Sequence, residues 1–235
     1  MKISAEGSAM NERRGWITST GLSAFFVALL LTGCGSDGSS LENKNPGNND
    51  LNVVVAFGDS ITQGGECACA PYPARLAGLI GKVVYNTGVG GSTATSNAGR
   101  TQSAIDKYHP AYMFILYGIN DVIHSANPAS VLPALGQMVQ ICKQNNVVPV
   151  LMTYPRPMLG HNLFAGPTIS LNRGIRSLAG AEGVRCVDLE REFADGKDPL
   201  NPEWRTSDLA LLGPDGLHPN DAGTQVIALA CADQF

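Results

Sequence analysis

Four short polar segments that contain glycine carry the side chains of this chain best suited to covalent catalysis. They are Gly58–Thr62, Asn86–Thr93, Gly118–Asp121 and Asp215–Pro219. Nucleophilic catalysis needs a hydroxyl, a base within hydrogen-bond reach, a group that orients the base, and donors for the developing oxyanion. The four segments together offer a candidate for each of these roles.

The candidates have chemical properties that suit these roles. Ser60 supplies a hydroxyl, and His218 is of the residue type whose unperturbed pKa lies nearest neutrality, so it can accept a proton and return it. Asp215 stands three residues before His218 and could hold the tautomer that leaves the other ring nitrogen free. Asn120 is a neutral donor, and glycine in Asn86–Thr93 lets a backbone N–H approach a substrate carbonyl without a side-chain clash.

Each segment also has a simpler interpretation when it is taken alone. Gly-Asp-Ser is a plausible helix-capping turn, and Asn120 with Asp121 could cap a loop. The glycine run could suggest dinucleotide binding, but a G-x-G-x-x-G pattern that begins at Gly88 needs glycine at position 93, which is Thr93. The combination of all four segments therefore favours catalysis. The elbow motif G-x-S-x-G is excluded around Ser60, because position 62 is Thr, and this argues against the α/β-hydrolase fold.

Three other histidines compete with His218 for the role of base. His109 precedes a proline at the entry to an expected strand, which is the wrong end of the sheet, and His161 lies in a long loop that could border the site. His124 is the serious rival, because Asp121 precedes it by the same three residues that separate Asp215 from His218.

The apolar pattern from Leu51 onward alternates between short strand-like runs and helical stripes. The runs are rich in Val, Ile and Leu without strict alternation, which is typical of strands covered on both faces. The strands expected are 52–57, 82–86, 111–117, 147–153 and 184–188, and the helices are 72–81, 98–108, 129–145, 168–180 and 220–232. Repeated strand–helix units predict a parallel three-layer α/β domain, whose chemistry lies at the carboxyl ends of the strands.

The four segments, in this order, resemble the conserved blocks of the SGNH hydrolases, also called the GDSL family, from Val53 to about Ala230. The resemblance implies a flavodoxin-like α/β/α sandwich with a central, mainly parallel five-stranded sheet. It implies an ester hydrolase without cofactor or metal, in which Ser60 is the nucleophile, His218 the base and Asp215 its orienting partner. The oxyanion donors would be the N–H of Ser60, the amide of Asn120 and a glycine N–H, with Gly91 favoured and Gly90 the alternative.

The N-terminal residues predict export and lipidation. Arg13 and Arg14 precede an apolar stretch that is too short and interrupted for a comfortable membrane span, and it ends in Leu31-Thr-Gly-Cys34, which resembles the bacterial lipobox. We therefore expect a signal peptide over 1–33, a lipidated Cys34 with a flexible tether over 34–51, and the catalytic domain over 52–235. By family resemblance, the Gly that follows Cys34 favours the outer membrane.

Five further cysteines remain in what would be an oxidising compartment. Cys142, Cys186 and Cys231 lie in expected helices or a strand and are interpreted as buried small hydrophobic residues. Cys67 and Cys69 lie in a loop just after Ser60. No matching Cys or His pair at zinc spacing occurs elsewhere, so a metal site is not expected, and whether these two form a disulfide stays open.

Charge limits the partners. The net charge is −4 over the whole chain and becomes −5 after removal of 1–33, and Lys and Arg are scattered, so nucleic acid is not an expected partner.

We expect a monomer that acts on a small ester. The short domain leaves little sequence for a lid, which favours short or medium acyl chains, with segments 63–73 and 154–167 shaping the cleft. Carbohydrate O-acetyl esters, acyl transfer to another alcohol, and a binding module without catalysis are the alternatives.

Overall fold

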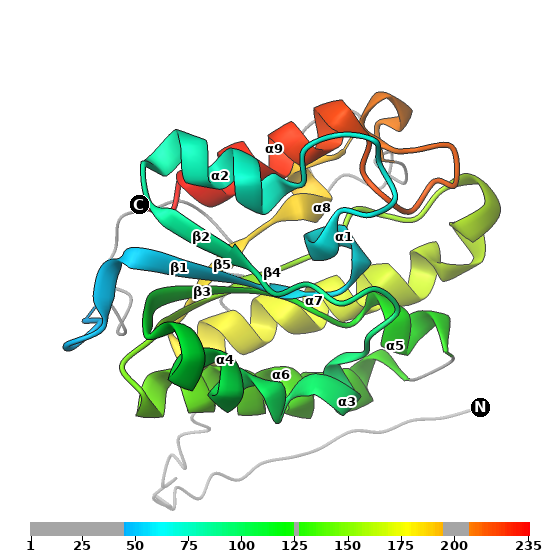
Figure 1. Cartoon of the computed structure of the whole chain (residues 1–235). Coiled ribbons are helices and arrows are strands. Elements are labelled where there is room, and N and C mark those ends of the chain that lie inside the picture. The colour runs from blue at the N-terminus through cyan, green and yellow to red at the C-terminus, as the bar shows by residue number, and fades with distance from the viewer. Residues whose placement is uncertain (1–44, 125–126, 195–206) are drawn as a thin grey trace, which may run out of the picture. The chain divides into compact units, whose positions relative to one another are not determined.

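The computed structural model describes residues 45–124, 127–194 and 207–235. The expected signal peptide and Cys34, with most of the tether, lie outside the described residues. Five parallel strands form one sheet in the order β2-β1-β3-β4-β5 (Figure 1). They are β1 (Asp50–Gly58), β2 (Val83–Asn86), β3 (Pro110–Leu116), β4 (Val148–Met152) and β5 (Arg185–Val187). All five expected strands are therefore confirmed, each within a few residues of its predicted bounds.

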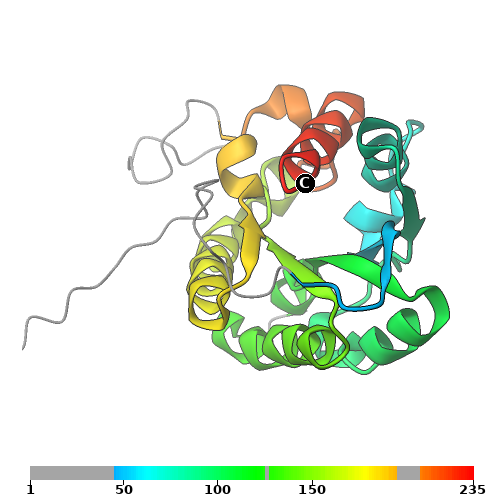
Figure 2. The ribbon, with the colours of Figure 1, turned by 90° about the vertical axis from the view of Figure 1, so that its left-hand side faces the viewer.

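Helices cover both faces of the sheet and give three layers. Helices α2 (Tyr72–Ile80), α8 (Leu189–Glu192) and α9 (Asp221–Ala232) lie on one face, and α4 (Arg100–Tyr108), α6 (Pro128–Gln144) and α7 (Ala165–Glu182) lie on the other (Figures 1 and 2). The central strands are consequently buried on both sides, as their Val- and Ile-rich sequences require. This is the flavodoxin-like α/β/α sandwich that the resemblance implied.

The predicted apolar stripe of α6 faces the sheet. Val131, Leu135, Met138, Val139 and Cys142 are its buried residues. Asn127 accepts a hydrogen bond from the Ala129 N–H and caps the helix. The helical spacing of the five buried residues therefore determines which face of α6 packs against the sheet.

Short elements at the strand ends are absent from the sequence prediction, because one or two turns are too short to show a helical period. They are α1 (Ser60–Gln63), α3 (Ala94–Asn97), α5 (Ile119–Ile123), α8, η1 (Leu159–Phe164) and η2 (Leu209–Leu211). Three of these, α1, α3 and α5, begin within or beside the polar segments that the sequence singled out. Among the described residues, no helix is long and apolar enough to cross a membrane.

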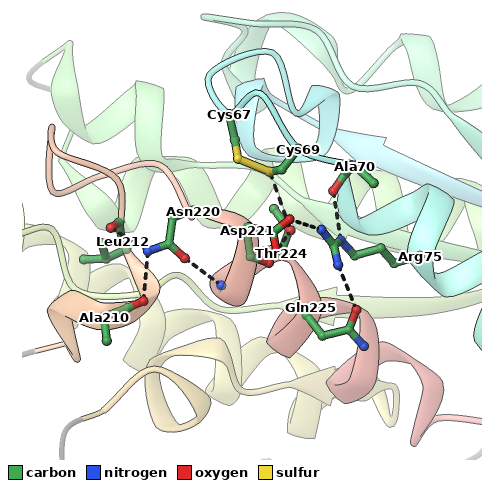
Figure 3. The surroundings of a disulfide bond; sticks show 11 residues. Cys67, Cys69, Ala70, Arg75, Ala210, Leu212, Asn220, Asp221, Thr224 and Gln225 are labelled. Atoms are coloured by element: carbon green, nitrogen blue, oxygen red, sulfur yellow. Dashed lines mark hydrogen bonds and ion pairs between the residues drawn. A yellow bond between two sulfur atoms is a disulfide. The ribbon is translucent and has the colours of Figure 1, made fainter.

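The cysteines behave in two ways. Cys142 and Cys231 are buried free thiols, as expected. Cys186 is not a free thiol, and it is only half-buried because β5 is an edge strand of the sheet. The expectation of a buried small hydrophobic residue is therefore wrong for Cys186. Cys67 and Cys69 form a disulfide in the loop between α1 and α2 (Figure 3).

That loop is fixed against the first turns of α9. Thr224 Oγ1 lies 3.9 Å from Cys69 Sγ. Arg75, on α2, donates to the Ala70 carbonyl at 3.0 Å and to the Gln225 side chain at 3.0 Å, and it forms an ion pair with Asp221 (Figure 3). These contacts join the loop that follows Ser60 to the helix that follows His218.

Candidate active site

The tight turn between β1 and α1 explains the Gly-Asp-Ser segment. A Cβ atom on Gly58 would lie 2.2 Å from Thr62 Oγ1 and 2.7 Å from the Leu116 carbonyl oxygen, so only glycine fits where β1 turns into α1. Asp59 then caps α1 by accepting from the Ile61 N–H at 3.0 Å. Ser60 becomes the first residue of α1, at the carboxyl end of the sheet, and its side chain is partly exposed.

Ser60, His218 and Asp215 form one hydrogen-bonded chain. Ser60 Oγ lies 2.9 Å from His218 Nε2, and His218 Nδ1 lies 2.5 Å from Asp215 Oδ2. Because a carboxylate only accepts, Nδ1 carries the proton and Nε2 is free to accept from the serine hydroxyl. The serine lies after β1 and the other two residues lie just before α9, so the fold brings together residues 158 positions apart.

Asp215 is held in its ionised form. Partial burial by itself would raise the pKa of Asp215, but the hydrogen bond from His218 and those from the N–H groups of Leu217 (3.0 Å) and His218 (3.1 Å) lower it below its ordinary value. The side chain of Asp215 is 36% exposed and that of His218 17% exposed, so the pair borders an open site.

The loop that carries Asp215 and His218 is clamped by η1. The Met158 N–H donates to the Gly216 carbonyl at 2.7 Å, and His161 Nδ1 lies 2.9 Å from the Asp215 carbonyl oxygen, which can only accept. Gly216 has a φ of +72°, and a Cβ there would lie 2.3 Å from the Met158 carbonyl oxygen. The sequence prediction that segment 154–167 could border the site is supported, and His161 takes a structural part in it.

The expected oxyanion donors differ in whether a neighbouring acceptor already binds them. Among the described residues, the N–H groups of Ser60 and Gly91 have no acceptor, whereas the Gly90 N–H donates to Gln63 Oε1 at 3.0 Å. Asn120 Nδ2 donates to the Ser92 carbonyl at 3.0 Å, which occupies one of its two N–H groups and leaves the other available. Gly91 also has a φ of +69°, a conformation that suits glycine.

Asp121 and His124 do not form a second Asp–His pair. The buried Asp121 carboxylate accepts from the Ala94 N–H at 2.7 Å and from the N–H (3.2 Å) and hydroxyl (2.9 Å) of Thr95. His124 is exposed at the end of α5. The Asp121 carboxylate therefore holds α3 in place. The third rival, His109, lies at the end of α4, which is at the opposite end of the sheet.

Two further residues at the site were not singled out from the sequence. Asp59 is completely buried, and Tyr154, which follows β4, donates its hydroxyl proton to Asp59 Oδ2 at 2.6 Å. The position of Asp59 beside Ser60 was the available signal, and no local pattern could have revealed Tyr154. Within the part of the chain that the structure describes, no group of three or more His, Cys, Asp or Glu residues could hold a metal ion.

Comparisons with known proteins concern the fold and the family of this chain. The uncharacterized lipoprotein YqeF of Bacillus subtilis (strain 168) is 27% identical over 207 residues, which cover 74% of this chain and 85% of YqeF. A lipolytic G-D-S-L family structure from Desulfitobacterium hafniense DCB-2 superposes with a TM-score of 0.65 at 21% identity, over 78% of this chain and 99% of that one. The acetylxylan esterase Axe2 of Geobacillus stearothermophilus superposes with a TM-score of 0.61 at 22% identity, over 78% and 93%.

The two structural likenesses, each below 25% identity, show the fold. The family assignment comes from the sequence model of the GDSL-like lipase/acylhydrolase family, which matches residues 56–226. This match spans the segments of Ser60, Asn120 and His218 and covers most of the chain. The protein therefore belongs to the GDSL-like lipase/acylhydrolase family and is an esterase-type hydrolase.

Proposed function

We propose that this protein hydrolyses carboxylic esters with short or medium acyl chains through an acyl-enzyme on Ser60. The observation that carries the proposal is the continuous chain from Ser60 Oγ through both ring nitrogens of His218 to Asp215, at 2.9 and 2.5 Å. This arrangement supports a serine nucleophile, a general base and an orienting carboxylate.

The acylation step follows from the hydrogen bonds. Ser60 Oγ attacks the ester carbonyl carbon while His218 Nε2 takes the hydroxyl proton, and Asp215 stabilises the imidazolium that forms. The negative charge moves to the carbonyl oxygen. When the tetrahedral intermediate collapses, the C–O bond to the alcohol breaks and His218 gives its proton to the departing oxygen. A water molecule then attacks the acyl-enzyme in the same way and releases the acid.

The oxyanion would be held by the N–H groups of Ser60 and Gly91 and by the Asn120 amide. The unused N–H of Gly91 supports its choice over Gly90, whose N–H is already bound to the Gln63 side chain. Because the donors are held by the backbone and by Ser92, they need little reorganisation when charge develops.

A covalent probe tests the nucleophile. A fluorophosphonate should label the wild-type protein and the Ser170→Ala variant, which loses an exposed hydroxyl on α7, and should fail to label Ser60→Ala. Labelling that persists in Ser60→Ala contradicts the proposal.

The base is tested by comparing two histidine variants. His218→Ala should lose nearly all hydrolysis of p-nitrophenyl acetate, whereas His124→Ala should keep it.

A substrate panel tests the acyl and alcohol preference. Rates over an acyl-length series of p-nitrophenyl esters should fall beyond about ten carbons if the cleft is open and short. Acetylated xylan in the same panel tests for a carbohydrate O-acetylesterase, and product analysis with a sugar acceptor tests for acyl transfer. A preference for longer chains contradicts the short-chain proposal.

We also propose that Cys34 is lipidated and anchors the enzyme to the cell envelope. The proposal is supported by the Leu31-Thr-Gly-Cys34 sequence and by the similarity to the lipoprotein YqeF. In a bacterial host, a labelled fatty acid should enter the full-length chain and not its Cys34→Ala variant. Equal labelling of both chains contradicts the anchor, and membrane fractionation would identify the membrane that receives it.

A further inference from the structure

Asp59 is a buried carboxylate directly beside the reactive serine. Its side chain is completely buried, with Oδ1 accepting from the Ile61 N–H at 3.0 Å and Oδ2 accepting from the Tyr154 hydroxyl at 2.6 Å. Tyr154 is itself fixed, because the Asn172 side chain accepts from its N–H and donates to its carbonyl, both at 2.8 Å. The position of the Asp59 charge is thus set by β1, α1, the end of β4 and α7.

This carboxylate has no permanent cation as a partner. Among the described residues, no Lys or Arg forms an ion pair with Asp59. The titratable groups that interact with it are Tyr72 on α2, Tyr117 after β3, Tyr154 after β4, and His218 before α9. Burial raises the pKa of each of the three tyrosines above its ordinary value, so they stay neutral.

His218 is therefore the one group of this set that can become a cation near Asp59. It does so when it takes the proton of Ser60, and the charge on Asp59 attracts it. A capping role alone would not need this charge, since asparagine caps helices as well as aspartate does. Burying an unpaired carboxylate is unfavourable, so a neutral side chain would give a more stable protein.

We propose that Asp59 is a positioning residue that acts through His218: its buried charge stabilises the imidazolium formed during attack by Ser60, while its hydrogen bonds hold α1 in place. It complements Asp215, which touches the ring but is 36% exposed, so water screens part of the Asp215 charge. The Asp59 charge is not screened by solvent in this way, because the side chain is completely buried. The inference rests on the proposed function of Ser60 and His218.

Asp59 also titrates in a range where its effect can be measured. Burial raises the pKa of Asp59 to about 6, and the hydrogen bonds from Tyr154 and the Ile61 N–H, together with attraction to His218, limit the rise. Above this pH the wild-type enzyme carries the charge. Well below it, the wild-type residue is neutral like asparagine.

The decisive test compares wild type with Asp59→Asn across pH. Asparagine keeps the size of the side chain, an acceptor for the Ile61 N–H and a hydrogen bond with Tyr154, and it removes the charge. At pH 8, kcat/KM for p-nitrophenyl acetate should fall on the order of tenfold, as expected for loss of one nearby opposite charge. The wild-type to variant ratio should then approach one below pH 5. A ratio that stays constant with pH indicates a merely structural role and overturns the inference.

Two further variants sharpen this test. Tyr154→Phe removes the hydroxyl that holds down the pKa of Asp59, so the loss of activity on acidification should begin at higher pH than in the wild type. Asp106→Asn removes the same charge from the exposed surface of α4 and should leave the profile unchanged. An unshifted Tyr154→Phe profile contradicts the inference. Fluorophosphonate labelling that depends on Ser60, together with a flat Asp59→Asn ratio, overturns only the role of Asp59, whereas labelling that survives Ser60→Ala contradicts the proposed function itself.

Discussion

Single residues at the active site differ in how their charges and hydrogen bonds are used. Asp215 is partly exposed and its pKa is lowered by the hydrogen bonds it accepts, whereas Asp59 is buried and its pKa is raised to about 6. Asp121 is buried as well, but its carboxylate binds backbone and hydroxyl donors of α3. These three aspartates thus lie in three different environments, which are set by burial and by the donors that each one meets.

Asn120 provides the first prediction at this scale. Asn120→Ala removes the one side-chain donor of the proposed oxyanion hole, so kcat should fall by roughly 10²–10³, as is typical when one such donor is lost. Steady-state kinetics with p-nitrophenyl acetate would measure this. Ser170→Ala serves as the control, and an unchanged kcat in Asn120→Ala would exclude Asn120 from the hole.

Asp59 provides a second prediction, in which stability and activity change in opposite directions. The pKa of Asp59 rises from 3.8 to about 6 on folding, so the folded state binds the proton more tightly than the unfolded state. The free energy of unfolding therefore falls as pH rises from about 4 to about 6, and it stays at the lower value above that range. Asp59→Asn should raise the free energy of unfolding by roughly 1–3 kcal/mol at pH 8 and by little at about pH 3.5, below the unfolded pKa. Urea unfolding at both pH values checks this; destabilisation at both would contradict it.

Short helices are the elements that bring the reactive groups together. Helices α1 and α5 follow β1 and β3 almost directly, α3 follows β2 after the segment 87–93, and register places Gly58 of β1 beside Leu116 of β3. Segments that follow these two strands therefore emerge side by side at the same edge of the sheet. Asn120 and Asp121 on α5 then hold the Gly91-containing segment through Ser92, Ala94 and Thr95.

The contact between α5 and α3 can be tested by Asp121→Ala. The change leaves the buried Ala94 N–H without an acceptor, which should cost about 1–3 kcal/mol of unfolding free energy. It should also loosen Gly91 and lower kcat about tenfold, because the proposed oxyanion donor would lose its fixed position. Thermal unfolding and kinetics measure the two effects. Asp106→Ala, at an exposed position on α4, should change stability by less than about 0.5 kcal/mol; an equal effect of both variants would contradict this reading.

At the largest scale, the part of the chain that the structure describes holds its sheet between two helical layers. Cys142 on α6 and Cys231 on α9 lie in opposite layers, and both are completely buried free thiols. Burial raises the pKa of Cys142 to about 12 and raises that of Cys231 well above its ordinary value. Both sulfurs are therefore protonated and inaccessible in the folded state.

These two thiols should report on global unfolding. Because thiolates are the reactive form, iodoacetamide should modify Cys142 and Cys231 only when the protein unfolds, and at the same rate for both. Peptide mapping by mass spectrometry after timed exposure in increasing urea would measure this. Rapid modification of either cysteine without denaturant would show that its helical layer opens by itself.

Much of this organisation is already present in the sequence. The alternation of Val-rich runs with helical stripes predicts the strands and long helices, because burial on two faces and on one stripe impose different periods. The glycines and polar residues after the strands predict where the reactive groups gather. The short helices and Tyr154 could not be predicted in this way, since a single turn shows no period and the Tyr154–Asp59 contact joins residues 95 positions apart.

The sequence by itself determined the types of the reactive residues and their attachment to the strand ends. Spacing alone left two Asp–His pairs, Asp121 with His124 and Asp215 with His218, and two candidate glycines, and only the family resemblance favoured His218 and Gly91. Only the tertiary structure supplies a physical difference between the pairs, because the Asp121 carboxylate meets donors of α3 whereas Asp215 meets the ring of His218. Spacing along the chain fixes local geometry, but the availability of a carboxylate depends on the donors that distant segments bring to it.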